Sequence, residues 1–162
     1  MALLVIRPVA SSADYAERLR SVVAAGVDAA RTADFEQSED ISVEALPPWF
    51  QVLSTEGQLD VRNDEVGIEG RRQYLAHRES RPWSWQDWIY CFEPGLRAWS
   101  WWDLTVREDG RLSLWVDTKG EAHVPCEELW WSAYVSGALT IDSMMLESAD
   151  VWAGQASVGA LQ

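Results

Sequence analysis

Lysine and cysteine are scarce in this sequence of 162 residues. Lys119 is the single lysine, and 26 acidic residues against 13 basic ones give a formal net charge of −13. Because such a charge repels phosphate backbones and anionic lipids, it argues against direct binding to nucleic acid or to a membrane surface. The two cysteines, Cys91 and Cys126, are too few for a disulfide framework, and we expect a cytoplasmic protein.

Long apolar runs and catalytic motifs are also missing. The N-terminal run from Ala2 to Ile6 ends at Arg7 and Pro8, which indicates a short strand rather than a signal peptide or a membrane span. The stretch GIEGRR lacks the Lys-Ser/Thr pair of a phosphate loop, and no cysteine pair has zinc-finger spacing. We therefore expect no metal, no cofactor and no catalytic residue, which favours a non-enzymatic function.

Tryptophan and acidic residues are the two abundant features. The chain has 11 Trp, more than its 3 Phe and 4 Tyr together. Residues 34 to 69 hold ten of the acids against Arg62 alone. Within that segment, the proline pair of ALPPWFQVLS predicts a short helix, and the glycine-containing remainder reads as loop with a weak strand.

The pattern of apolar residues predicts an α+β fold. A helix is expected over about 12–31, where Leu19, Val22 and Val23 follow helical spacing, and a second over about 125–136, which ends at Gly137. Between them, residues 83–92, 96–107 and 111–118 alternate with period two and predict a three-stranded antiparallel meander over about 83–118. We expect one domain over 1–152, with a strand near 139–146, and a frayed tail over 153–162.

The last hairpin of this meander has a preferred register. A three-residue loop with Gly110 left-handed sets Val106 against Leu112 and Leu104 against Leu114, so that the apolar residues pair. The same register puts Trp102 opposite Val116 on the core face, and it sets Asp103 opposite Trp115 and Trp101 opposite Asp117 on the other face. The opposite face then carries alternating indoles and carboxylates, and its predicted partner-binding residues are Trp85, Asp87, Trp99, Trp101, Asp103, Trp115 and Asp117, beside Trp83.

Such a face has two interpretations. Indole faces attract cations and neighbouring carboxylates bind arginine, so the face suits a basic protein loop or a cationic ligand. Alternatively, the first helix or the segment around Trp49 covers the face and makes the indoles a second core layer. Exposed aromatic side chains could equally serve a homodimer.

The stretch GRLSLWVDTKGEAHVPCEELWWSAYVSGA resembles, in its general character, the small acidic immunity proteins of bacterial polymorphic-toxin systems. That resemblance covers about residues 83–138 and implies an α+β domain that binds and blocks one toxin. We expect a binding protein that neutralises a basic partner. The alternatives are a module that binds a sugar or a cationic ligand, and a hydrolase that uses Asp87 and Asp103.

Overall fold

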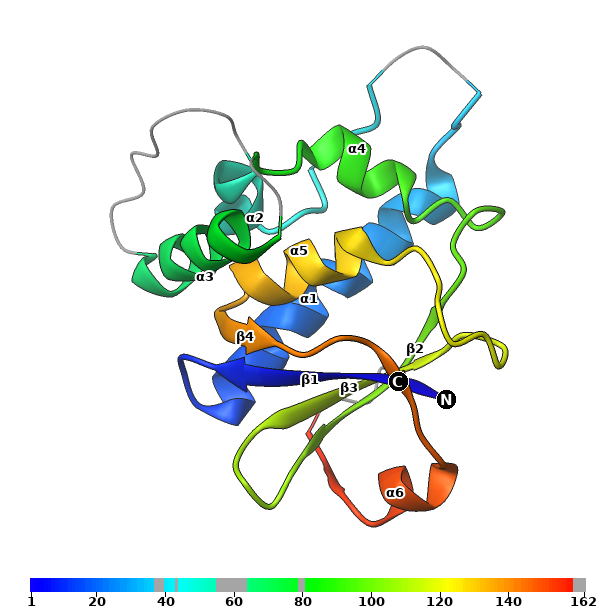
Figure 1. The fold of residues 1–162 in the computed structure, drawn as a ribbon. Helices are drawn as coiled ribbons and strands as arrows, with labels where there is room; N and C mark the ends of the chain where they lie inside the picture. The colour runs from blue at the N-terminus through cyan, green and yellow to red at the C-terminus, as the bar shows by residue number, and fades with distance from the viewer. Residues whose placement is uncertain (37–39, 43, 55–63, 79–80, 159–162) are drawn as a thin grey trace.

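The computed structural model describes residues 1–36, 40–42, 44–54, 64–78 and 81–158. In this part of the chain, six strands form one antiparallel sheet. Helices α1 to α5 lie on one side of the sheet and the short helix α6 lies on the other (Figure 1). The predicted α+β class is confirmed. Among the described residues, no helix is long and apolar enough to cross a membrane.

The sheet places its N-terminal strand between strands from the second half of the sequence. The strand order is β4-β1-β3-β2-β6, and β5 also pairs with β1. The strands are β1 (Ala2–Pro8), β2 (Ser100–Val106), β3 (Leu112–Asp117), β4 (Ala138–Ile141), β5 (Met145–Leu146) and β6 (Ala156–Ser157).

Both of the long predicted helices are present. Ser11 caps α1 (Ser12–Thr32) by accepting a hydrogen bond from the Asp14 amide, and α5 (Glu127–Val135) ends before Gly137, whose φ is 111°. The proline pair opens the short helix α2 (Pro48–Leu53), as predicted. The remaining helices are α3 (Glu65–His77), α4 (Trp85–Tyr90) and α6 (Ala149–Ala153).

The first strand of the predicted meander is wrong, because residues 85–90 form helix α4 instead. The Ser84 hydroxyl caps this helix by accepting from the Asp87 amide at 3.1 Å. Alternation over 83–92 matched a strand, but Trp85, Trp88, Ile89 and Phe92 also follow helical spacing, and the last three are fully buried. The residues fit both the period of a strand and that of a helix, and burial against the other helices selects the helix.

Helix α3 replaces the loop and weak strand predicted before Arg71. Gly67 and Gly70 suggested a turn, but both are buried on the face that α3 turns toward its neighbours. A Cβ atom on Gly70 would overlap the carbonyl oxygen of Tyr134 in α5. Gly70 therefore allows α3 and α5 to approach closely, and neither glycine marks a loop.

The β2–β3 hairpin follows the predicted register over its first half. Val106 lies opposite Leu112, Leu104 opposite Leu114 and Asp103 opposite Trp115, and Gly110 has φ 78°. A bulge between Trp101 and Asp103 then shifts the pairing, so that Trp101 lies opposite Val116 and Ser100 opposite Asp117. The predicted pairs Trp102–Val116 and Trp101–Asp117 are wrong, because an extra residue in one strand moves the later pairs.

The sheet has two differently covered faces. Ala2, Leu4 and Ile6 of β1 pack into the main core under the helices. Leu3 and Val5 point to the other face, which we call the underside, and pack there with Trp115. Most of the buried apolar residues lie on the helical side, whereas in the described part of the chain the underside is covered by the C-terminal segment (Figure 1).

The tail that was expected to be frayed forms this cover in part. Residues 156–157 make β6, which pairs with Thr105 and Val106 of β2. The Val158 amide donates to the Leu104 carbonyl at 2.7 Å. The last four residues of the predicted tail lie outside the described part of the chain.

Candidate functional site

The seven predicted partner-binding residues do not share one surface. Trp85 and Asp87 lie on α4, on the helical side of the sheet, and Trp99 precedes β2 and is only 1% exposed. Asp103 and Trp115 are buried on the underside, while Trp101 is half-buried against the main core. Asp117, at the end of β3, and Asp87 are exposed. The alternating face described above is therefore divided between two sides of the molecule.

Trp99 belongs to the core. Its ring lies 5.7 Å from the ring of Phe92, and its indole N–H donates to Glu128 Oε1 at 2.5 Å. The Arg97 guanidinium lies 5.6 Å from the centroid of the same ring. Burial is the main cause that raises the pKa of Glu128 from 4.5 to about 7, and the repulsion of Glu127 adds to it. This carboxyl is therefore a buried titratable group without access for a partner.

Asp103 and Trp115 form a polar network on the underside. The Trp115 indole donates to the Thr105 hydroxyl at 2.8 Å. The Asp103 carboxylate accepts from the Trp152 indole at 2.9 Å and from the Ser157 hydroxyl at 2.7 Å. These two donors come from the C-terminal cover, so that the network holds this segment on the sheet. Asp103 and Asp87 lie on opposite sides of the sheet, which separates the pair that a hydrolase would need.

Sequence reasoning missed the most exposed indole. Trp102 was expected in the core, but the bulge turns it toward the underside, where it is 46% exposed. Its ring meets that of Trp152 edge to face, with centroids 5.6 Å apart. No sequence signal identified the bulge. Asp103, which binds the Trp152 indole, was predicted only as part of the alternating face.

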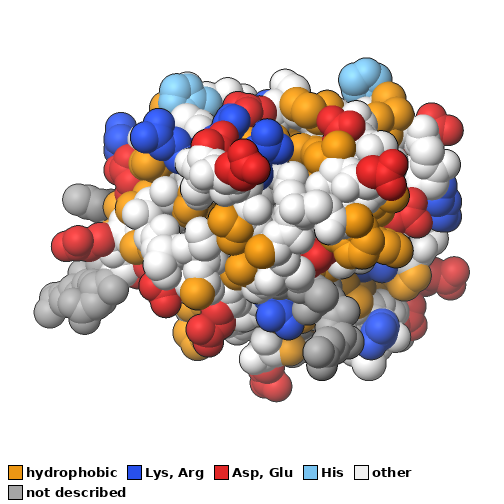
Figure 2. Space-filling view, turned by 90° about the horizontal axis from the view of Figure 1, so that it is seen from below, with side chains coloured by type: hydrophobic (Ala, Val, Ile, Leu, Met, Phe, Trp, Pro, Cys, Tyr) orange, Lys and Arg blue, Asp and Glu red, His pale blue; other side chains and the backbone are white. Residues whose placement is uncertain are grey.

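Trp102 belongs to a group of exposed and half-buried apolar side chains that we call the underside patch. Met145 lies opposite Leu3 and so shares its face, and it is 44% exposed. Viewed from this side, hydrophobic side chains appear in several groups across the middle of the face (Figure 2). The underside patch consists of Met1, Trp102, Met145 and Trp152.

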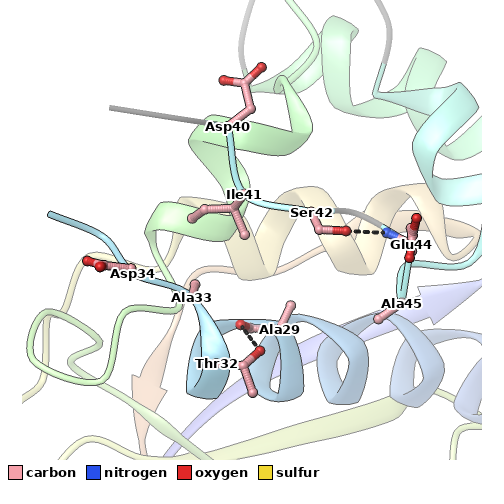
Figure 3. A pocket seen from close by; sticks show the side chains of 9 residues that line it. All are labelled: Ala29, Thr32, Ala33, Asp34, Asp40, Ile41, Ser42, Glu44 and Ala45. Carbon is pink, nitrogen blue, oxygen red and sulfur yellow. Dashed lines mark hydrogen bonds between the residues drawn. The ribbon is translucent and has the colours of Figure 1, made fainter. Parts of the chain in front are cut away.

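A separate open pocket lies between the end of α1 and the segments 40–42 and 44–45. It encloses about 400 Å³ and includes Asp34, Asp40 and Glu44 in its lining. Figure 3 shows the carboxylate of Asp40 pointing away from the gap. The Gln86 side chain holds the Ile41 backbone by two hydrogen bonds of 3.0 and 3.2 Å. The acids therefore surround the pocket without converging on one point.

A second groove, of about 440 Å³, lies between the end of α3 and the start of α5. The Arg78 guanidinium stacks on the ring of Trp130, 3.4 Å from its centroid, and donates to the Ile141 carbonyl. His123 and Cys126 also line this groove. Burial is the main cause that raises the pKa of the Cys126 thiol to about 12, whereas a nucleophilic cysteine needs a lowered pKa.

Among the described residues, no group of three His, Cys, Asp or Glu side chains is placed to hold a metal ion. No family of proteins, no curated protein and no solved structure matches this chain. Function must therefore be argued from the charges and exposed side chains. Two features remain for that argument, namely the excess of acids at the surface and the underside patch.

Proposed function

We propose that this protein is a non-enzymatic binding protein that neutralises a basic protein partner, as immunity proteins neutralise bacterial toxins. The observation that carries the proposal is the net charge of −13. A surface of this sign attracts basic proteins and accelerates their encounter, in a way that added salt weakens.

Many of the basic side chains have partners within the chain, whereas several acids face the solvent. Arg18 is enclosed between Asp64 and the Trp49 ring, 3.6 Å from its centroid. Arg107 and Arg111 lie within 4 Å of Asp109. Other basic side chains also have partners: Arg31 and Arg72 are paired with acids at the surface, and Arg78 and Arg97 lie over tryptophan rings. Glu17, Glu36, Asp40 and Glu44, in contrast, are exposed to solvent.

The compartment and origin belong to the same proposal. The two cysteines are free thiols in the structure, as in proteins of a reducing cytoplasm. The proposal thus describes a cytoplasmic bacterial protein that meets its toxin before or after secretion.

The direct test is co-expression with the product of the neighbouring gene, followed by affinity purification at low and at high salt. We expect a complex at low salt and a slower association at high salt, because salt screens the attraction. A neutral protein of similar size serves as the control. The absence of a complex at low salt, with both proteins folded, would contradict the proposal.

A further inference from the structure

We propose that the underside patch is the docking site for a protein segment in which lysine or arginine flanks an apolar side chain. The proposal rests on the proposed function and adds the surface that carries it. Trp102 is the most exposed of the eleven tryptophans, all of which the structure describes. Large aromatic side chains at the centre of an interface commonly dominate its binding energy.

The patch is held in place by the network beneath it. Trp152 packs on the Leu3, Val5 and Trp115 cluster and donates to the buried Asp103 carboxylate. Its ring in turn supports the edge-to-face contact with Trp102. The exposed indole is therefore fixed against a second ring, and a partner would lose little side-chain entropy in binding it.

Charge decides which occupant fits. The segments that build the patch, residues 1–3, 100–103, 115–117 and 144–152, contain four acids and no Lys, Arg or His. Their one cation is the N-terminal amine, which donates to the Glu147 carbonyl at 3.4 Å. Elsewhere on the underside, Arg111 is paired with Asp109 and Asp142, and Arg7 is exposed on the same face of β1 as Leu3 and Val5. The four acids are Asp103, Asp117, Glu147 and Asp150.

A second copy of the chain does not match this surface. It would bring the same acids face to face and would add another −13 to the assembly, which costs free energy. A cationic segment gains from Asp117, Glu147 and Asp150, whereas the Asp103 carboxylate is buried and already hydrogen-bonded. It also gains from the indole faces, which attract ammonium and guanidinium groups. The apolar side chains of the patch require that the segment also present an apolar residue. An amphipathic basic segment meets both requirements.

Two synthetic peptides of equal length and charge test the proposal: a leucine–lysine amphipathic helix, and the same peptide with serine in place of leucine. We expect the leucine peptide to bind at low salt and to shift the indole N–H resonances of Trp102 and Trp152 in ¹⁵N spectra. Trp102→Ala should weaken binding about tenfold or more, as a hot-spot tryptophan does. The matched control is Leu96→Ala, whose side chain is 70% exposed outside the patch.

A variant that changes only a surface charge tests the electrostatic part of the proposal without altering the packing of the patch. Asp150 is exposed in the first turn of α6, and Asp150→Lys should weaken binding of the leucine peptide several-fold. Equal affinity of Trp102→Ala and the wild type would overturn the docking site, and so would equal affinity for the two peptides or no binding of either. The proposed function would then still be tested separately, by co-expression with the product of the neighbouring gene. A dimer in sedimentation velocity that Trp102→Ala dissociates would assign the patch to a second copy.

Discussion

Glu128 shows how a single side chain can lower the stability of this fold. The carboxyl is 4% exposed on α5 and accepts a hydrogen bond from the Trp99 indole. Burial raises its pKa from 4.5 to about 7, so the folded protein holds this proton more tightly than the unfolded chain does. Stability from this group is complete below about pH 4.5 and is lost as pH rises through 7.

Replacement of this carboxyl by a neutral amide should remove the loss of folding stability at high pH. Glu128→Gln can still accept from the Trp99 indole, and it carries no charge at any pH. We expect this variant to exceed the wild type at pH 8 by up to on the order of 3 kcal/mol in free energy of unfolding, and to match it at pH 4. Denaturant unfolding at both pH values measures the difference.

The control for this prediction is Glu17→Gln, on the exposed face of α1. It removes one negative charge without changing a buried group, so it should give only a small gain at pH 8. An equal gain from both variants would show that net charge, and not burial of Glu128, limits stability.

At the scale of elements, the sequence predicted helices and strands well where only one period fits the apolar residues. Helix α1 begins one residue after its cap at Ser11, and the β2–β3 hairpin keeps its register as far as Asp103. Residues 83–92 satisfy both periods, and only the burial of Trp88 under the neighbouring helices selects the helix. That contact joins segments forty positions apart, and no local pattern contains it.

The contact between α3 and α5 depends on Gly70. A Cβ atom there would overlap the backbone of Tyr134, which no side-chain rotation can relieve. Gly70→Ala should therefore lower the free energy of unfolding by about 3 kcal/mol, although alanine favours an isolated helix more than glycine does. Thermal or urea unfolding of the purified variant measures this loss.

Gly154→Ala is the matched control, because a Cβ atom at Gly154 would lie 3.6 Å from its nearest neighbour and the residue has φ −81°. It should change stability by a few tenths of a kcal/mol. If Gly70→Ala proved as stable as this control, α3 would have to be able to move away from α5 at little cost.

For the whole molecule, the sequence predicted the class and the charge but not the exposed surface. The alternating face required residues 83–92 to be a strand, and helix α4 removes Trp85 and Asp87 from it. The bulge at Trp101–Asp103 then buries Asp103 and exposes Trp102. A bulge depends on pairing with neighbouring strands, and β2 has β3 on one side and the distant β6 on the other. The candidate surface thus depended on long-range packing.

The net charge makes a prediction for the whole molecule that needs no partner. At pH 8 the excess carboxylates repel one another in the folded state more than in the expanded unfolded chain, so added NaCl should raise the Tm by screening this repulsion. Near the sequence pI of 4.4, the net charge vanishes and the same salt should change the Tm far less. Differential scanning calorimetry at the two pH values separates this screening from effects of salt on apolar surface, which act at both. A Tm at pH 8 that falls with NaCl would mean that ion pairs such as Arg18–Asp64 outweigh the repulsion. The surface field would then be weaker than attraction of a basic partner requires.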